Sequence, residues 1–321
     1  MKDKYLTKNA PFFERMDKLN DILTKSKSIA FLSGSGVSSV SGVPDIRSVG
    51  RLCSEDDGIL EGYDYEYLLS HECLTSNPEL FFRFYRKKMD QRGFVPNIVH
   101  RTLAEMEADK KLIAVITQNT DMLYEDAGIK NIYKLHGTSD RAHCTKCGAT
   151  FPSERIYNNP TPVPCCNCGG MIRPDITLYE ESLNTDVVKK AAHALGKADT
   201  LILCGTSMTM PYLHNLISKF AGQYMVMINN ELTSIDDLCE IVFREDMRDV
   251  FEFINWKGST NGIEAITDLE GLTMWVEALG VSDFNKQALN LVDPQYYKIY
   301  FRKCKTKEDV EKVCERLRNQ R

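Results

Sequence analysis

The chain has 321 residues, a formal net charge of −5 and 43% hydrophobic residues, which is enough apolar content for one large or two ordinary globular domains. The first twenty residues are too polar for a secretory signal, and no apolar run is long enough to cross a membrane. We therefore expect a cytoplasmic protein without a membrane partner. The acidic balance argues against nucleic acid as a general partner.

Helical and strand patterns alternate along most of the chain. Periodic apolar spacing predicts helices at residues 11–27, 78–90, 98–110, 184–197 and 211–221, and apolar runs predict strands at 29–32, 112–116, 132–135, 200–204 and 224–228. Residues 49–75 show no clear period, which indicates an irregular segment, and residues 171–179 read as extended. The alternation predicts an α/β fold built on a doubly wound, Rossmann-like parallel sheet.

A glycine turn follows the first strand, with Gly34 and Gly36 beside Ser35 and Ser38. Glycines let a phosphate approach the backbone closely, so this turn is a candidate nucleotide site. The usual dinucleotide fingerprint has a third glycine where this chain has Ser39. A plain strand-to-helix turn therefore remains an alternative at this point.

Polar residues follow the other strands. Asn119 and Asp121 come after the strand at 112–116, and the carboxyl ends of parallel strands are where open α/β sheets bind ligands. Each of these residues could equally cap a helix. His136 follows the strand at 132–135, and taken alone a histidine is more often structural than catalytic.

The eleven cysteines include two clusters, Cys144-x-x-Cys147 and Cys165-x-x-Cys168, with 17 residues between them. An odd total with such clusters favours metal over a secreted disulfide framework. Four thiolates fill a tetrahedron, so we expect a structural zinc without an open position for water. Cys166 is an alternative fourth ligand, but Cys165 gives two matching knuckles and is preferred.

Taken together and in order, these motifs resemble the sirtuin family of NAD-dependent protein lysine deacylases, and most closely its bacterial, compact type. The resemblance covers residues 10–254 and implies a catalytic core with a zinc-ribbon module inserted at about 138–178 and a helical lobe. It rests on the stretch from Gly34 to Ser48, on Thr117 to Leu123, on Leu135-His136-Gly137, on the four cysteines, on Gly205-Thr206-Ser207 and on Asn229-x-Glu231.

The resemblance implies a role for each motif. Acyl-lysine oxygen would attack the NAD ribose as nicotinamide leaves, and His136 would take a proton from a ribose hydroxyl, which gives free lysine, nicotinamide and an O-acyl-ADP-ribose. Asn119 would be the second catalytic residue, and NAD (the co-substrate) would contact Gly34, Ser35, Gly36, Ser38, Asp45, Arg47, Gln118, Asp121, Gly205, Thr206, Ser207, Asn229 and Glu231. Structural zinc would be held by Cys144, Cys147, Cys165 and Cys168.

Several positions depart from the family pattern. The chain has Ser35 where the family has alanine, Ile46 where it has phenylalanine, and Thr120 where it has isoleucine. It has Tyr124 in place of histidine, Thr177 in place of valine, and Tyr179-Glu180-Glu181 in place of Phe-Gly-Glu. A glutamate in place of glycine could hinder the approach of a peptide backbone. Tyr85 and Arg86 are adjacent, whereas the long-acid deacylases pair a tyrosine and an arginine three residues apart, so we expect acetyl or another uncharged acyl group.

Residues 255–321 extend beyond the resemblance. We expect short helices within 263–279, a strand at 296–301 and a helix at 307–318 opened by a capping box of Thr306 and Asp309. Residues 298–321 contain nine basic and four acidic side chains, a local net charge of +5. This segment is either a solvated helix face or a docking surface for an acidic partner.

Three functions compete at this stage. The first is a protein lysine deacylase. The second, motivated by Ile46, Thr177 and Glu180, is ADP-ribosyl transfer or NAD hydrolysis at the same site. The third is a non-catalytic NAD-binding sensor or scaffold, against which His136 and Asn119 both count.

Overall fold

The computed structural model describes residues 10–45, 62–258, 263 and 266–319. Its centre is a six-stranded sheet with the order β3-β2-β1-β7-β8-β9, in which all neighbouring strands are parallel. The strands are β1 (Ile29–Ser33), β2 (Leu112–Thr117), β3 (Ile132–Lys134), β7 (Thr200–Cys204), β8 (Tyr224–Ile228) and β9 (Ile241–Phe243). Strand order reverses between β1 and β7, and such a switch point opens a crevice at the carboxyl ends of the strands. The expected doubly wound sheet is confirmed.

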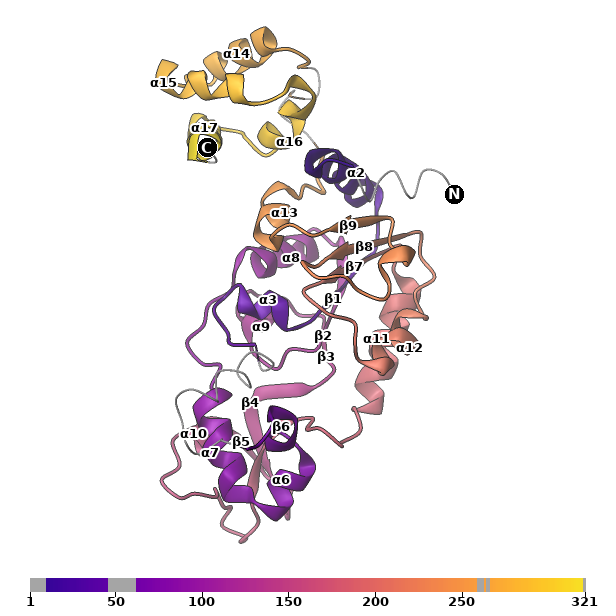
Figure 1. The fold of residues 1–321 in the computed structure, drawn as a ribbon, viewed down its shortest axis with the longest axis vertical. Coiled ribbons are helices and arrows are strands. Elements are labelled where there is room, and N and C mark those ends of the chain that lie inside the picture. Colours follow the sequence, from indigo (N-terminus) through magenta and orange to yellow (C-terminus); the bar gives the residue numbers. More distant parts are fainter. Residues whose placement is uncertain (1–9, 46–61, 259–262, 264–265, 320–321) are drawn as a thin grey trace.

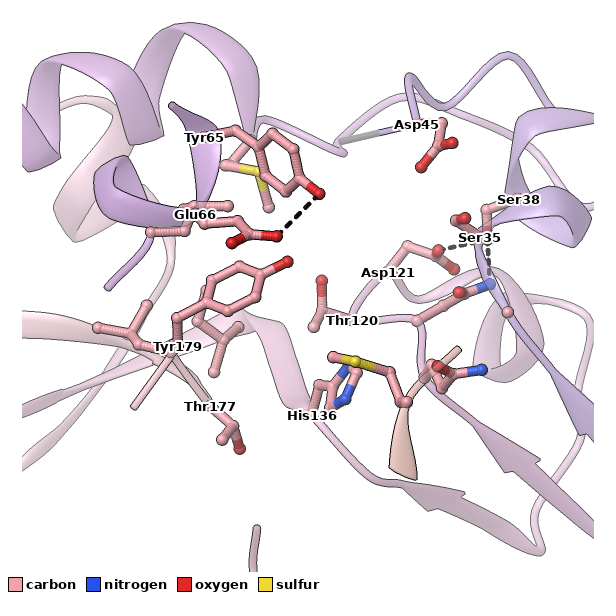
Figure 2. A pocket seen from close by; sticks show the side chains of 18 of the residues that line it. Ser35, Ser38, Asp45, Tyr65, Glu66, Thr120, Asp121, His136, Thr177 and Tyr179 are labelled. Atoms are coloured by element: carbon pink, nitrogen blue, oxygen red, sulfur yellow. Dashed lines mark hydrogen bonds between the residues drawn. The ribbon is translucent and has the colours of Figure 1, made fainter. Parts of the chain in front are cut away.

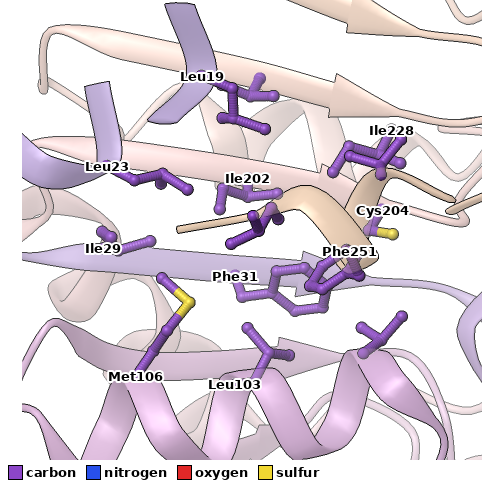
Figure 3. Close-up of a cluster of buried hydrophobic side chains, with 14 of the residues drawn as sticks. Leu19, Leu23, Ile29, Phe31, Leu103, Met106, Ile202, Cys204, Ile228 and Phe251 are labelled. Atoms are coloured by element: carbon purple, nitrogen blue, oxygen red, sulfur yellow. The ribbon is translucent and has the colours of Figure 1, made fainter. Parts of the chain in front are cut away.

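Helices cover both faces of this sheet, as Figure 1 shows. One face carries α2 (Phe12–Lys25), α8 (Ile98–Ala108) and α13 (Met247–Phe253), and the other carries α11 (Thr185–Lys197) and α12 (Pro211–Ile217). Figure 3 shows how the first face is filled: Leu19 and Leu23 from α2, Leu103 and Met106 from α8 and Phe251 from α13 pack on the strands. Strands buried on both faces explain why their sequences are continuous apolar runs.

A second lobe lies at the other end of the molecule from the C-terminus (Figure 1). Its antiparallel sheet has the order β5-β4-β6, formed by β4 (Gly137–Cys144), β5 (Thr150–Pro152) and β6 (Ile172–Ile176). A separate hydrophobic cluster joins this sheet to α5 (Tyr65–Leu68), α6 (His71–Ser76), α7 (Pro78–Lys88) and α10 (Glu154–Tyr157).

Part of the segment expected to be irregular is helical. Residues 62–75 contain α5 and most of α6, and the Ser70 side chain caps α6 by accepting a hydrogen bond from the Cys73 backbone N–H at 2.9 Å. Two helices this short contain too few residues to show a hydrophobic period, so pattern analysis missed them. The remainder of that segment, residues 49–61, lies outside the described residues.

Short elements connect the strands to the cavity described below. These are α3 (Ser35–Ser39), which follows β1, and α9 (Leu123–Asp126), which follows β2. The 3-10 turn η1 (Asp236–Leu238) lies between β8 and β9. No helix among the described residues is both long enough and apolar enough to span a membrane.

The C-terminal residues form a helical lobe with its own hydrophobic cluster. It contains α14 (Leu269–Ala278), α15 (Asp283–Lys286), η3 (Gln287–Leu291), η4 (Pro294–Tyr296), α16 (Tyr297–Phe301) and α17 (Lys307–Asn319). The expected capping box is present at α17, where Asp309 N–H donates to Thr306 Oγ1 at 3.3 Å and Thr306 N–H donates to an Asp309 carboxylate oxygen at 3.0 Å.

The expected strand at 296–301 is wrong, because these residues form η4 and α16. Tyr297, Ile299 and Phe301 are buried, and that alternation is what resembles a strand. In the structure Tyr297 and Phe301, four residues apart, face the cluster of the C-terminal lobe, whereas Ile299 faces the main core. A helix enclosed between two apolar surfaces therefore buries alternate residues.

The basic side chains of this segment contact the rest of the chain. Lys298 pairs with Asp17 of α2 at 2.5 Å, and Arg316 pairs with Asp249 and Glu252 of α13 at 3.5 and 3.3 Å. The Arg316 guanidinium also lies 4.6 Å from the centre of the Phe253 ring. Two basic side chains of the C-terminal segment therefore find acidic partners on α2 and α13 within the same molecule.

Candidate active site

A cavity of about 440 Å³ lies at the carboxyl ends of β1, β2 and β7, the switch point of the sheet. Figure 2 shows Ser35, Ser38 and Asp45 on one side of it, Tyr65 and Tyr179 on the other, and His136 between them. Ser35 and Ser38 belong to α3 and Asp45 to the loop beyond it, all after β1 of the main sheet, and the second lobe supplies the two tyrosines. The cavity is therefore formed between the two lobes.

The two glycine turns pack against each other beside this cavity. Gly34 N–H donates to Cys204 O at 3.2 Å and Gly36 N–H donates to Gly205 O at 3.0 Å. A Cβ atom on Gly34 would lie 2.7 Å from Gly205 O, and one on Gly36 would lie 2.9 Å from Gly205 Cα. Both glycines are required for this backbone contact, which brings together two motifs 170 residues apart in the chain.

Buried hydrogen bonds fix the polar side chains that follow β2. Asn119 Nδ2 donates to Ser38 Oγ at 2.7 Å, and Ser38 Oγ donates to Asp121 Oδ2 at 2.6 Å. The other Asp121 oxygen accepts from Leu123 N–H at 3.1 Å. All three side chains are more than 90% buried, so this group is held in place before any ligand arrives. Figure 2 labels two of them, Ser38 and Asp121.

His136 stands where β3 passes into β4. A Cβ atom on Gly137 would lie 2.2 Å from Asp175 O, and the φ angle of Gly137 is 76°, so only glycine fits after this histidine. Burial lowers the pKa of His136, which keeps the imidazole neutral at pH 7 and able to accept a proton. Its Nε2 atom lies 2.7 Å from the hydroxyl of Tyr212, a residue that sequence analysis did not single out.

A second cavity of about 570 Å³ continues from the first and shares Ser35, Asp45 and Ser207 with it. Asn229 and Glu231 line its far part, after β8. Arg244 braces this loop by donating to Asn229 O at 2.8 Å and to Glu231 O at 2.7 Å. The two cavities are continuous, and polar residues line both of them. Together they can receive an extended ligand with polar groups at both ends.

The residues predicted to contact a ligand lie in these cavities wherever the structure describes them. The first cavity is lined by Gly34, Ser35, Ser38, Asp45, Gln118, Asn119, Asp121, His136, Thr206 and Ser207. The second is lined by Ser35, Gly36, Asp45, Gly205, Ser207, Asn229 and Glu231. Arg47 and Ile46 lie outside the described residues.

Thr120 and Tyr124, two of the residues that differ from the family pattern, form side-chain hydrogen bonds. Thr120 Oγ1 donates to Gln91 Oε1 at 3.0 Å, which ties the loop after β2 to the second lobe. The buried Tyr124 hydroxyl donates to Ser33 Oγ at 2.7 Å, and Ser33 Oγ donates to Thr117 Oγ1 at 2.9 Å. Both substitutions thus support the floor of the cavity.

Thr177, Tyr179 and Glu180, which also differ from the family pattern, shape the opening of the first cavity. Thr177 and Tyr179 line the cavity, and the Tyr179 backbone is fixed to the second lobe by hydrogen bonds from His71 N–H at 3.1 Å and to Leu69 O at 3.0 Å. Glu180 has a φ angle of 72°, a backbone conformation that favours glycine. Its carboxylate accepts a hydrogen bond from Glu72 N–H at 3.0 Å, at the start of α6.

Four sulfur atoms in the second lobe lie within 4.8 Å of one another, those of Cys144, Cys147, Cys166 and Cys168. The closest pairs are 3.5 Å (Cys144 to Cys168) and 3.8 Å (Cys147 to Cys166), and a tetrahedral zinc with bonds of about 2.3 Å places its sulfurs about 3.8 Å apart. A Cβ atom on Gly170 would lie 2.6 Å from Cys144 Sγ. The cluster therefore fits a structural zinc.

The structure corrects the fourth ligand, because Cys166 joins this cluster and Cys165 does not. Cys165 forms an antiparallel bridge with Met171, and its sulfur lies 3.7 Å from Val163 O. Neighbouring side chains in an extended segment point to opposite faces, so only one of these two cysteines can face the cluster. Hydrogen bonds between Cys166 and Gly169-Gly170 close the knuckle around Cys166.

Comparison with known proteins assigns the chain and its fold to one family. Residues 34–211 match the family model described as "Sir2 family". An "NAD-dependent protein deacetylase" of Clostridium acetobutylicum is 37% identical over 242 residues, which are 75% of this chain and 98% of that protein. The chain belongs to the Sir2 family, the sirtuins.

Solved structures support the same conclusion. A Sir2 homologue in complex with NAD is similar with a TM-score of 0.65 and 30% sequence identity, over 74% of this chain and 91% of that one. Sir2Tm bound to a propionylated peptide has a TM-score of 0.65 and 27% identity, over 74% of this chain and 96% of that one. NAD is the co-substrate of this family member, and the cysteine cluster is compatible with its structural zinc.

Proposed function

We propose that this protein is an NAD-dependent protein lysine deacylase. The observation that carries the proposal is the cavity between the lobes, in which the fixed Asn119–Ser38–Asp121 group and the neutral His136 line the same space. A deacetylase relative and a relative bound to an acylated peptide support it. The catalytic core is residues 10–254, with the zinc module at 138–178, and residues 255–321 are an extension.

NAD occupies both cavities in this proposal. Asn229 and Glu231 offer a carbonyl and a carboxylate to the hydroxyls of the adenosine ribose, and the backbone between Gly34 and Gly36 approaches the pyrophosphate. Asn119 and Asp121 hold the carboxamide of nicotinamide. Because these two side chains are already fixed by Ser38, little ordering is needed when NAD binds.

The reaction has two parts. The oxygen of the acyl group attacks the ribose carbon, and the bond to nicotinamide breaks with its electron pair leaving on nicotinamide. A ribose hydroxyl then loses its proton toward His136 and attacks the former acyl carbon, and the lysine amine leaves. Water completes the sequence and yields an O-acyl-ADP-ribose.

The acyl-lysine side of the cavity favours uncharged acyl groups. Leu69, Met89, Ile176 and Leu178 line it, and no lysine or arginine is found among its lining residues in the described part of the chain. Arg86 donates instead to Ile156 O and Thr161 O, both at 2.9 Å, so it is not available to hold an acyl carboxylate. Acetyl and short aliphatic acyl groups are therefore the expected substrates.

A reducing compartment suits the reduced thiol cluster, and a cytoplasmic location is part of the proposal.

ADP-ribosyl transfer or NAD hydrolysis is the second candidate function, because Thr177 and Glu180 differ from the family pattern at the mouth of the cavity. The acidic residue Glu180 is among those that line the first cavity.

An experiment with NAD labelled in its adenylate phosphate separates these functions. With an acetyl-lysine peptide, we expect the label in soluble O-acetyl-ADP-ribose, and we expect His136→Ala to lose this product while its affinity for NAD stays within about threefold. Label fixed to protein would favour ADP-ribosyl transfer, and label in free ADP-ribose regardless of peptide would favour hydrolysis. Binding of NAD without any conversion of NAD would favour the third function, a non-catalytic NAD-binding sensor or scaffold.

A further inference from the structure

The hydroxyl of Tyr212 contacts the Nε2 atom of His136 beside the first cavity. Tyr212 is the second residue of α12, directly after Pro211, and both Tyr212 and His136 line the first cavity. The hydroxyl lies 2.7 Å from His136 Nε2, and the edges of the two rings meet at 77° with centres 5.9 Å apart. This short contact joins α12 to the turn between β3 and β4.

The second polar partner of the imidazole sets the direction of this hydrogen bond. A backbone hydrogen bond with Gln118 raises the pKa of His136, which only an acceptor of a ring N–H can do. A neutral imidazole carries one N–H, and with that proton on the nitrogen that faces the Gln118 carbonyl, Nε2 is the acceptor. The Tyr212 hydroxyl therefore donates to Nε2.

The phenol of Tyr212 is well suited to remain a donor. Burial and the neighbouring Tyr179 raise its pKa, so the hydroxyl keeps its proton at pH 7. The contact to Gln118 Oε1 is much longer, 3.5 Å, and Gln118 Nε2 itself donates to Thr206 Oγ1 at 3.0 Å. The hydroxyl proton of Tyr212 is therefore directed at His136 Nε2. The Tyr212 oxygen keeps a lone pair that can accept a further hydrogen bond.

Because the Tyr212 hydroxyl lies against Nε2, a ribose hydroxyl would reach this nitrogen through Tyr212. We propose that Tyr212 is a catalytic proton relay between the NAD ribose and His136. This inference rests on the function proposed above and adds a residue to its second part. It assigns the direct contact with the ribose hydroxyl to the tyrosine oxygen.

The proton movements balance. The ribose O–H bond breaks as its proton bonds to the Tyr212 oxygen, and the Tyr212 O–H bond breaks as its proton bonds to His136 Nε2. The electron pair of the ribose oxygen forms the bond to the acyl carbon. His136 becomes an imidazolium and later returns its proton to the departing lysine amine.

Tyr212→Phe tests the relay, because it removes one oxygen and keeps the ring that packs on His136. Cleavage of NAD to nicotinamide precedes the base step, so the variant should still exchange labelled nicotinamide into NAD in the presence of acetyl peptide, within about threefold of the wild-type rate. Formation of deacetylated peptide should fall about 100-fold or more in kcat with little change in KM, consistent with the contribution of a general base. Tyr224→Phe, in β8 outside both cavities, is the matched control.

Each other outcome contradicts the relay. Equal product formation by Tyr212→Phe and wild type would show that the ribose reaches His136 directly. A parallel fall in exchange, product and melting temperature would assign Tyr212 a structural role. Absence of peptide-dependent nicotinamide exchange in the wild type would overturn the deacylase proposal itself, and an active wild type with an unaffected variant would overturn the relay alone.

Discussion

Ser38 shows how single residues prepare this cavity. Its hydroxyl accepts from Asn119 and donates to Asp121, so one small side chain fixes two predicted ligand-binding residues. A buried carboxylate without its donor carries a desolvation penalty of about 1–3 kcal/mol. The small residues after Gly36 therefore do more than allow a close backbone turn.

Glu181 provides a residue-level prediction about pH. Burial raises the pKa of this carboxyl, but hydrogen bonds from Arg173, Leu178 N–H and His71 outweigh it and lower the pKa from 4.5 to about 2. A lowered pKa contributes stability above the unfolded value, and this contribution is lost as pH falls from about 4.5 toward 2. The contribution is roughly 2–3 kcal/mol at neutral pH.

We expect Glu181→Gln to unfold more easily than wild type at pH 7, by an amount of that order, and the gap to narrow below pH 4.5. Urea unfolding at pH 7, 4 and 2.5 measures both effects. A gap of constant size across these pH values would show that the loss reflects packing and not the charge of Glu181.

Residue identities near the site were largely predictable, and two details were not. Glycine turns and polar strand ends have chemistry that sequence spacing reveals, so the predicted ligand-binding residues that the structure describes all line the two cavities. The choice between Cys165 and Cys166 depends on which side chain of an extended segment faces the cluster, and spacing alone does not show this. Tyr212 was missed because its role arises from contact with a residue 76 positions away.

At the scale of elements, long periodic segments were predicted well. The buried strands and the helices α2, α7, α8 and α11 match their expected ranges to within about two residues. Short elements such as α5, α6 and β9 were not predicted, because three to six residues do not define a hydrophobic period. The α16 segment was assigned to the wrong class because burial against two clusters imitates a strand.

The zinc module yields the prediction at this scale. Cys166→Ser should lose bound zinc and lower the melting temperature of the protein, because three thiolates leave the tetrahedron incomplete and metal binding contributes to folding. Cys165→Ser is a matched control one residue away and should keep one zinc per chain. Metal analysis and thermal unfolding of both variants decide the matter, and the reverse pattern would restore Cys165 as the ligand.

At the scale of the whole molecule, aromatic contacts attach the C-terminal lobe to the core. Tyr300 of α16 lies 4.5 Å from Phe13 and 5.3 Å from Phe253 between ring centres. The ion pairs of Lys298 and Arg316 surround this contact. Exposed ion pairs contribute little individually, so the aromatic cluster should dominate the attachment.

We expect Tyr300→Ala to lower the free energy of unfolding by about 2–3 kcal/mol, since it removes a partly buried ring from two neighbours. Met274→Ala, in the same lobe but with 64% of its side chain exposed, should change it by less than about 0.5 kcal/mol. Urea unfolding curves give both values. Equal small effects would mean that the lobe is held by other contacts.

The cavity between the two lobes supports one chemical outcome above all, the consumption of NAD only when an acyl-lysine is present. The most direct measurement quantifies nicotinamide, deacetylated peptide and O-acetyl-ADP-ribose together, in one reaction of the wild-type protein with NAD and an acetyl-lysine peptide. Our account predicts equal amounts of the three products and none without the peptide. Nicotinamide released in excess of deacetylated peptide, or released without any peptide, would contradict it.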